Sequence, residues 1–585
     1  MFDDEKKIID AKIRQFLASE GIDVPELEFR QIPFSGEWGL AVPLFPIAAI
    51  EARTGKKVVV PKRAQELAEG LKDYLGKPHD GFSHVEATNG YLNLYFSTSG
   101  YAQRVVDTIL SENEDFGHGS NRHQTVMVEY SQPNTHKSFH VGHLRNVILG
   151  GSICRILEFA GYRVIRANYL GDIGLHVVKW MWNYLKNHNG EQPGANKTHW
   201  MNDIYAEADR LFQEPENEIE VRELYARWNE RDPEIVNLWK ETRQWSLEGF
   251  DQIYDQLGES FDRIYFESDV EDSGSQLVEE LIAKGVAQDE RPDGPVFIDL
   301  DAVLGTQDIY RVLVILRSDG SSLYATKDLP LAIQKFEAYD LDKSIYVIDV
   351  RQSLYLKQIF KTLEIMGYEW ADKLYHLAYE LVNLPGNVTM ASREGTVVLF
   401  DDLMVEATQR AREIVEIKNP ELNKDQKDEI AEAVALGALK YTMLSRDNTK
   451  VVTFDWDAAL DFNGQAAPYI QYAHVRAGSI LRKAGVELPE EAIFPDHLEK
   501  AEVNLIELMT KLPDEIVRAA EEYRPLVIAN LAFDLAKAFN DFYNSCQVLN
   551  TSQDIRAYRL RLVAAAKQVI STCLNLLGIT PPSAM

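Results

Sequence analysis

The chain has 585 residues, of which 45% are apolar and 26% charged, values that are ordinary for a globular protein of several domains. This composition excludes a collagen-like, low-complexity or disulfide-scaffold protein. The formal net charge of −30 argues against a surface that wraps nucleic acid throughout, although it allows a local contact.

Residues 1–120 are predicted to form a small α+β domain. Apolar residues between 8 and 17 have helical spacing, and the alternation over 91–96 is typical of a strand. Residues 126–130 then form a short buried strand, which a loop and a helix to about 160 follow before the next strand at 162–168. Strand, helix and strand in this order indicate a right-handed parallel unit.

Residues 121–405 are predicted to form an open α/β domain with a helical insertion. The insertion, at about 186–260, is polar, rich in Trp, Tyr and Glu, and has no strand pattern. Alternation returns at 296–300 and 312–316, and a buried parallel strand is expected at 344–350. Residues 406–585 have helical spacing throughout, which predicts an all-α domain.

The cysteines and the chain start bear on the compartment. The three cysteines (Cys154, Cys546 and Cys573) cannot all pair and lie far apart in the sequence, so free thiols are expected. Residues 1–7 lack the apolar core of a signal peptide, and the longest apolar stretch is too short to span a bilayer. We therefore expect a cytoplasmic protein that does not enter a membrane.

Residues 131–143, with the sequence SQPNTHKSFHVGH, lie between a predicted strand and a predicted helix. An open parallel sheet binds its ligands at this kind of junction. Gly142 lets the backbone approach a phosphate, while His140 and His143 can donate hydrogen bonds to its oxygens and stabilise the charge of a transferring α-phosphate. Two alternatives are a pair of surface histidines and a zinc site, although no cluster at metal spacing supplies further zinc ligands.

The tetrapeptide 140–143 resembles the HIGH signature of class I aminoacyl-tRNA synthetases. Over nearly the whole chain, further motifs are similar to those of arginyl-tRNA synthetases in particular. These motifs are LRN at 144–146, NYLGDIG at 168–174, RSDG at 317–320, YATKD at 324–328, DVRQS at 349–353, FDWD at 454–457, YIQYAHVR at 469–476 and LLGI at 576–579.

The resemblance implies both a fold and an activity. The fold is multidomain α/β, with an N-terminal α+β domain (1–120) that contacts the tRNA elbow, a Rossmann-like catalytic domain (121–405) and an all-α anticodon-binding domain (406–585). The activity is that of an arginine–tRNA ligase, which activates L-arginine with ATP and Mg²⁺ and then charges the 3′ end of tRNA(Arg). We expect a monomer that holds no tightly bound metal.

The second class signature, KMSKS, corresponds to residues 388–395. Thr389 stands at the position of the first lysine and Arg393 near the second, so the resemblance implies a degenerate ATP clamp with Met390, Ser392 and Arg393 near ATP. Lys137, three residues before His140, is then a catalytic candidate that supplies the missing charge. By residue type alone, the segment is an ordinary loop.

Recognition of arginine needs a carboxylate and preferably an aromatic wall, because a guanidinium carries five donors in a fixed fork. Tyr324 and Asp328, four residues apart, would share one helix face. They match the family's arginine-binding positions together with Gln352, while Asn134 and His143 match the positions for the α-amino and carboxylate end. Without the resemblance, Asp328 would be interpreted as an exposed carboxylate at a helix N-terminus.

For the anticodon, the candidate tRNA-binding residues are Tyr469, Tyr472, His474 and Arg476, although aromatic residues at helical spacing more often belong to a core. Two other functions remain open. The first is a class I ligase or nucleotidyl transferase with another small substrate. The second is a non-catalytic tRNA-binding paralogue, which the intact signature residues Asn134, Lys137, His140, Gly142 and His143 disfavour.

Overall fold

The computed structural model describes residues 3–23, 26–32, 36–53, 58–76, 82–384, 388–389, 398–582 and 584–585. Contacts within the chain divide it into two compact units. Unit 1 comprises Met1–Gly117, Tyr472–Asp514 and Leu531–Thr572. Unit 2 comprises His118–Gln471, Glu515–Asn530 and Cys573–Met585.

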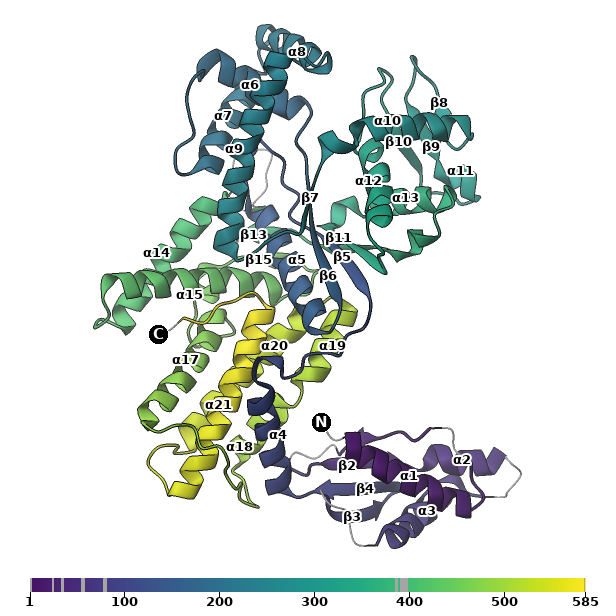
Figure 1. Ribbon diagram of the computed structural model, residues 1–585, viewed down its shortest axis with the longest axis vertical. Helices are drawn as coiled ribbons and strands as arrows, with labels where there is room; N and C mark the ends of the chain where they lie inside the picture. Colours follow the sequence, from purple (N-terminus) through teal and green to yellow (C-terminus); the bar gives the residue numbers. More distant parts are fainter. Residues whose placement is uncertain are drawn as a thin grey trace. The chain divides into compact units, whose positions relative to one another are not determined.

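The centre of unit 2 is a five-stranded sheet with the order β12-β11-β5-β6-β7, in which every neighbouring pair is parallel (Figure 1). Its strands are β5 (Thr125–Glu129), β6 (Arg163–Leu170), β7 (Arg263–Phe266), β11 (Lys343–Asp349) and β12 (Leu374–Tyr379). The chain runs outward from β5 to β7 and then returns to β11 on the other side of β5. The order therefore reverses between β5 and β11, where such sheets open a ligand crevice. The predicted parallel-sheet fold is confirmed.

Helices cover both faces of this sheet. The helix α5 (Val141–Phe159) connects β5 to β6 and packs against β6 and β11. The helices α12 (Tyr324–Ala338) and α13 (Ser353–Ile365) come before and after β11 in the chain. On this side of β5 the strands are added in the opposite direction to β6 and β7, so right-handed crossovers place these helices on the other face of the sheet. There Phe336 packs against a small core that includes Met127 and Ile165.

A helical layer is inserted between β6 and β7. It consists of α6 (Leu175–Asn187), α7 (Lys197–Leu211), α8 (Pro215–Asn229) and α9 (Pro233–Leu257). Its core is rich in tryptophan, with Trp180, Trp239 and Trp245 buried together. The layer begins 11 residues before the predicted start at 186, because α6 follows almost directly after β6.

Residues between β7 and β11 add a second core beside the sheet. The elements are α10 (Glu267–Ala283), β8 (Gln288–Asp289), β9 (Val296–Asp299), α11 (Leu300–Leu304) and β10 (Val312–Leu316). The strands form their own antiparallel sheet in the order β10-β9-β8. The alternation seen in the sequence at 296–300 and 312–316 therefore belongs to a separate small sheet.

After the parallel sheet the chain is mainly helical. The helices are α14 (Phe400–Lys418), α15 (Lys424–Leu444), α16 (Trp456–Ala459), α17 (Ala467–Ala484), α18 (Lys500–Met509), α19 (Leu512–Glu522), α20 (Leu526–Ser545) and α21 (Gln553–Leu576). A short sheet of order β14-β13-β15 contains β13 (Val382–Leu384), β14 (Val388–Thr389) and β15 (Val452–Thr453). The strand β15 lies in the region expected to be all-α, and its two residues are too few to leave a strand pattern.

The N-terminal part of unit 1 is an α+β domain with an antiparallel sheet of order β1-β2-β4-β3. Its elements are α1 (Asp3–Ser19), β1 (Arg30–Gln31), β2 (Gly39–Pro43), α2 (Phe45–Arg53), α3 (Val60–Leu75), β3 (Phe82–Thr88), β4 (Tyr91–Phe96) and α4 (Thr98–Glu112). Among the helices that the structure describes, none is long and apolar enough to cross a membrane.

Candidate active site

The loop between β5 and α5 holds several residues in a left-handed backbone conformation. Ser131, Gln132 and His136 have φ angles of 78°, 52° and 62°, which are costly for residues other than glycine. Asparagine side chains from outside the loop support it: Asn146 Oδ1 accepts from the Ser131 N–H at 2.7 Å, and Asn168 Oδ1 accepts from that of Gln132 at 3.0 Å. The fold thus imposes on this loop a shape that its residues disfavour locally.

His140 and His143 form a cap at the N-terminus of α5. His140 Nδ1 accepts from the backbone N–H groups of Gly142 at 3.1 Å and His143 at 3.4 Å, and His143 Nδ1 accepts from the His140 N–H at 3.3 Å. The two rings stack with their centroids 3.9 Å apart. A Cβ on Gly142 would lie 2.9 Å from His140 Cε1, so the cap requires glycine there.

Both imidazoles are neutral near pH 7. Burial lowers the pKa of His140 to about 4 and holds the pKa of His143 well below its usual value. A neutral imidazole that accepts a hydrogen bond at Nδ1 carries its proton on Nε2. Each ring therefore offers one N–H donor at a helix N-terminus, where the helix dipole also favours anions. This arrangement can bind a phosphate without transferring a proton.

A cavity of about 280 Å³ opens at the carboxyl ends of β5, β6 and β11. It contains four of the residues predicted to bind arginine: Asn134, Tyr324, Asp328 and Gln352. The complete lining is Glu129, Gln132, Asn134, Tyr169, Gly171, Glu267, Tyr324, Asp328, Leu331, Lys335, Tyr346, Ile348, Gln352, Tyr355, Leu356, Ile359 and Phe360. The fifth predicted residue, His143, is not among these lining residues.

Asp328 lies on the first turns of α12, on the same face as Tyr324. Tyr324 is 68% exposed, whereas Asp328 is half-buried inside the cavity. Burial raises the pKa of Asp328 to about 7, and the nearby carboxylates of Glu129 and Glu267 act in the same direction. A hydrogen bond from Tyr355 Oη to Asp328 Oδ2, at 2.5 Å, opposes this shift. A cationic ligand would therefore drive the ionisation of this carboxyl.

The other two cavity carboxylates are paired with lysines. Glu129, at the end of β5, forms an ion pair with the fully buried Lys335 and accepts a hydrogen bond from Gln132 Nε2 at 2.9 Å. Glu267 pairs with Lys327, with 2.7 Å between Nζ and Oε2. Because both charges are already compensated, Asp328 is the cavity carboxylate best suited to a cationic substrate.

Asn134 and Gly171 bring the loop after β5 against the loop after β6. They form a parallel bridge, and a Cβ on Gly171 would lie 2.1 Å from Asn134 Oδ1. Glycine at 171 is therefore necessary for Asn134 to reach the cavity. Lys137, on the same loop, lies over the ring of Tyr205 in α7, with Nζ 5.3 Å from the centroid. Its positive charge contributes to the low pKa of His143.

The predicted ATP clamp lies largely outside the described residues, and this includes Met390, Ser392 and Arg393. The chain that follows the clamp, from Val398 on, pairs with the histidine signature. Val398 O accepts from the Val141 N–H at 3.2 Å, and Phe139 O accepts from the Phe400 N–H at 3.0 Å. The described chain after the clamp segment therefore lies beside the two histidines.

The near end of the clamp is supported by Arg145, a buried residue of α5. Its guanidinium donates to Leu381 O at 2.8 Å and to Lys450 O at 3.1 Å, which are the residues just before β13 and β15. Burial lowers the pKa of Arg145 to about 10. One helix therefore carries the histidine cap and supports the chain near the starts of β13 and β15.

Comparisons with known proteins agree with this geometry. Residues 105–456 match the family model described as "tRNA synthetases class I (R), catalytic domain", and residues 470–585 match "DALR anticodon binding domain". An arginine–tRNA ligase of Clostridium perfringens is 34% identical over 98% of this chain and 99% of its own. An arginine–tRNA ligase of Bacteroides thetaiotaomicron is 33% identical over 99% of this chain and all of its own.

The chain belongs to the arginyl-tRNA synthetase family. The solved arginyl-tRNA synthetase of Thermus thermophilus is also similar, with a TM-score of 0.76 and 29% identity over 99% of this chain and all of that one. The recognition, fold class and enzyme class predicted from the sequence are thereby confirmed. As a member of this family, the protein is a class I aminoacyl-tRNA synthetase.

In this synthetase, the candidate anticodon residues lie on α17. Tyr469, Tyr472, His474 and Arg476 are all half-buried. The Arg476 guanidinium lies 4.5 Å from the ring centroid of Tyr472 and donates to Asn540 Oδ1 at 2.6 Å. Burial lowers the pKa of His474 to about 4. Tyr472 and Arg476 combine an aromatic face with a cation, a chemistry that suits an unstacked base.

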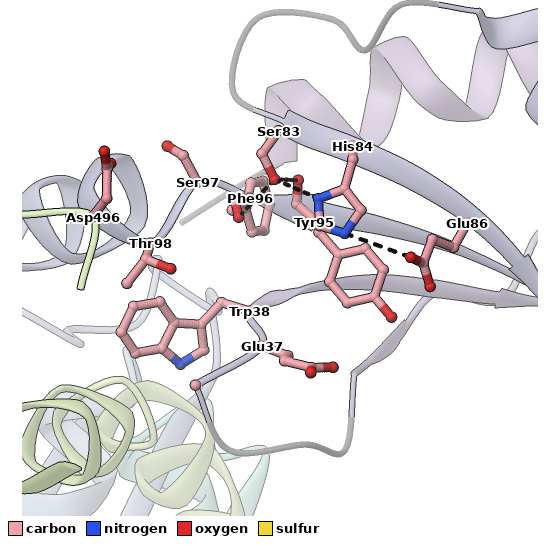
Figure 2. A pocket seen from close by; sticks show the side chains of 11 residues that line it. Glu37, Trp38, Ser83, His84, Glu86, Tyr95, Phe96, Ser97, Thr98 and Asp496 are labelled. Carbon is pink, nitrogen blue, oxygen red and sulfur yellow. Dashed lines mark hydrogen bonds and ion pairs between the residues drawn. The ribbon is translucent and has the colours of Figure 1, made fainter. Parts of the chain in front are cut away.

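Unit 1 of the synthetase contains another cavity, of about 360 Å³, lined mostly by the N-terminal domain (Figure 2). Trp38, Tyr95 and Phe96 supply aromatic surface, and the Tyr95 ring stacks on His84 with centroids 4.4 Å apart. The lining contains the carboxylates of Glu37, Glu86 and Asp496, and no Lys or Arg is found among its described residues. The described lining is Gly36, Glu37, Trp38, Ser83, His84, Glu86, Tyr95, Phe96, Ser97, Thr98 and Asp496. This lining favours a base over a phosphate.

Sequence reasoning missed several residues of the synthetase's main cavity. Glu129 could have been found, because a carboxylate that ends a buried strand at a ligand crevice is unusual. Tyr169 falls within the motif NYLGDIG but was given no role there, and Glu267 and Tyr355 gave no signal because each is an ordinary residue of a helix. Within the described residues, no group of His, Cys, Asp and Glu is arranged to hold a metal ion.

Proposed function

We propose that this protein forms arginyl-adenylate from L-arginine and ATP and then transfers the arginyl group to the 3′ end of tRNA(Arg). The observation that carries the proposal is the cavity around Asp328 in a chain of this family. Part of its lining comes from the loop that leads into the histidine-capped helix α5. In the first step the arginine carboxylate attacks the α-phosphate and pyrophosphate leaves. In the second step a terminal ribose hydroxyl of tRNA attacks the activated carbonyl and AMP leaves.

The cavity would select arginine by charge and shape. Asp328 supplies the carboxylate that a guanidinium requires, and Tyr324 supplies an aromatic wall at the exposed mouth. Gln352, just beyond β11, offers an amide oxygen as a further acceptor. Asn134 would hold the α-amino and carboxylate end, and this end would then point toward the histidine cap.

The histidine cap would stabilise the reacting phosphate. The Nε2–H donors of His140 and His143 and the N-terminus of α5 all favour negative charge, so they act by electrostatics. Mg²⁺ would accompany ATP and neutralise its phosphates. We also assign ATP contacts to Gly142 and, in the clamp segment, to Met390, Ser392 and Arg393.

Lys137 would supply a positive charge that the clamp segment lacks at Thr389. The proposal is supported by its position on the histidine loop and by its electrostatic effect on His143. Lys137→Met keeps the length of the side chain and removes the charge. Exchange should fall by about tenfold or more, since a charged group near a transferring phosphate is removed. A rate within a few fold of wild type would assign the charge to another residue.

The tRNA would contact both ends of the sequence. We assign anticodon contacts to Tyr469, Tyr472, His474 and Arg476, and an elbow contact to the N-terminal domain, where the aromatic and acidic cavity suits an unpaired base. The three domains proposed are 1–120, 121–405 and 406–585. We further propose that the protein acts in the cytoplasm as a monomer.

The test is ATP–pyrophosphate exchange with each of the twenty amino acids, with and without bulk tRNA. Exchange with arginine alone supports the proposal, and its dependence on added tRNA would show that tRNA completes the site. Exchange with a different amino acid would reassign the cavity to another substrate. No exchange from folded protein would favour a non-catalytic tRNA-binding paralogue.

A further inference from the structure

Tyr169 lines the arginine cavity and carries a buried hydroxyl group that no described residue engages. The residue lies near the end of β6, pairs with Tyr265 of β7 and lines the cavity. Its Oη atom is buried and has no hydrogen-bond partner among the described residues. Buried hydroxyl groups are normally satisfied, so this one calls for a partner that enters from the cavity.

The carboxylates of the cavity already have partners. Asp328 Oδ2 already accepts the hydrogen bond from Tyr355 Oη, and the carboxylates of Glu129 and Glu267 are paired with lysines. A guanidinium that reaches Asp328 brings five N–H donors, which one partly occupied carboxylate cannot satisfy. Burial raises the pKa of the Tyr169 hydroxyl and the charge of Asp328 acts in the same direction, so the two groups lie near each other at the cavity that both line.

We propose that Tyr169 is a specificity-determining residue whose Oη accepts a hydrogen bond from the guanidinium of bound arginine beside Asp328. This inference rests on the proposed function. It explains how the cavity distinguishes arginine from lysine beyond charge. A lysine ammonium satisfies Asp328 but lacks the planar fork, so it leaves the buried Tyr169 hydroxyl unpaired, and such unpaired groups make a site reject a near-analogue.

The test is Tyr169→Phe, which removes one oxygen and keeps the ring. The KM for arginine in pyrophosphate exchange should rise by about 10- to 100-fold, the range for losing a hydrogen bond to a charged group. The KM for ATP and the melting temperature should stay unchanged. The inhibition constant of lysine against arginine should also stay unchanged, so the preference for arginine falls by the same factor.

Tyr265→Phe is the matched control. It makes the same substitution on the paired strand, next to Tyr169, at a position that does not line the cavity. Its KM for arginine should equal that of the wild type.

Two results would overturn the inference. One is a KM for arginine in Tyr169→Phe within twofold of wild type. The other is a rise in arginine KM with an equal weakening of lysine inhibition or a lower melting temperature, because either would indicate a change of cavity shape. Failure of the proposed function is distinguishable, since wild-type protein would then show no exchange with arginine.

Discussion

The ionisation of Asp328 predicts how arginine binding depends on pH. Burial raises the pKa of this carboxyl to about 7, and a guanidinium binds only its ionised form. Below the pKa the group is protonated and neutral, so affinity is lost as pH falls. With a pKa near 7, about one tenth of the free enzyme is competent at pH 6 and about nine tenths at pH 8. The KM for arginine should therefore be about tenfold higher at pH 6 than at pH 8.

The assay is arginine-dependent pyrophosphate exchange at saturating ATP and tRNA over this pH range. The isosteric variant Asp328→Asn serves as the control, since it has no proton to lose. Its arginine KM should be independent of pH and higher than that of wild type by at least about 100-fold, because a buried cation then lacks its partner. A wild-type KM that is constant from pH 6 to pH 8, or an Asn variant that keeps the wild-type slope, would refute the reasoning.

Three further predictions follow from the same site. Tyr355→Phe removes a hydrogen bond that lowers the pKa of Asp328, so this pKa should rise. The increase in arginine KM that accompanies falling pH should then begin at a higher pH than in the wild type, and an unchanged profile would mean that this bond does not act on the carboxyl. His143→Ala should lower kcat by about 100- to 1000-fold, the usual cost of a lost transition-state donor, and kcat of the wild type should show no histidine titration between pH 6 and 8. Arg145→Met removes the hydrogen bonds of a buried guanidinium to Leu381 O and Lys450 O and should cost about 1 to 3 kcal/mol of stability, visible as a lower melting temperature, whereas an unchanged melting temperature would show that water replaces the guanidinium.

The sequence was sufficient for the frame of the catalytic domain because its signals are local. The order of strand, helix and strand around α5 follows from the residues themselves, and the four-residue spacing of Tyr324 and Asp328 requires only a helix. The partner of Glu129 could not be predicted in this way. Lys335 is 206 residues away, and only the parallel pairing of β5 with β11 brings α12 close enough.

Other features were hidden because they depend on packing. The short strands β13 and β15 exist only because their partners come from distant parts of the chain, and two or three residues carry no periodicity. The left-handed loop after β5 contains no glycine before Gly142, so its shape had to come from the tertiary contacts of Asn146 and Asn168. For the same reason the Tyr169 hydroxyl, which has no partner within the described part of the chain, is visible only in the folded structure.

The backbone hydrogen bonds between 139–141 and 398–400 have an evolutionary consequence. The histidine signature and the stretch that follows the predicted clamp, some 250 residues apart in the sequence, share backbone hydrogen bonds, so a change that shifts either backbone is transmitted to the other. Selection would then act on the pair as a single inherited unit. Across related enzymes, substitutions in the two stretches should covary, and a lineage could lose a charged residue from one stretch and recruit it in the other without remodelling the domain.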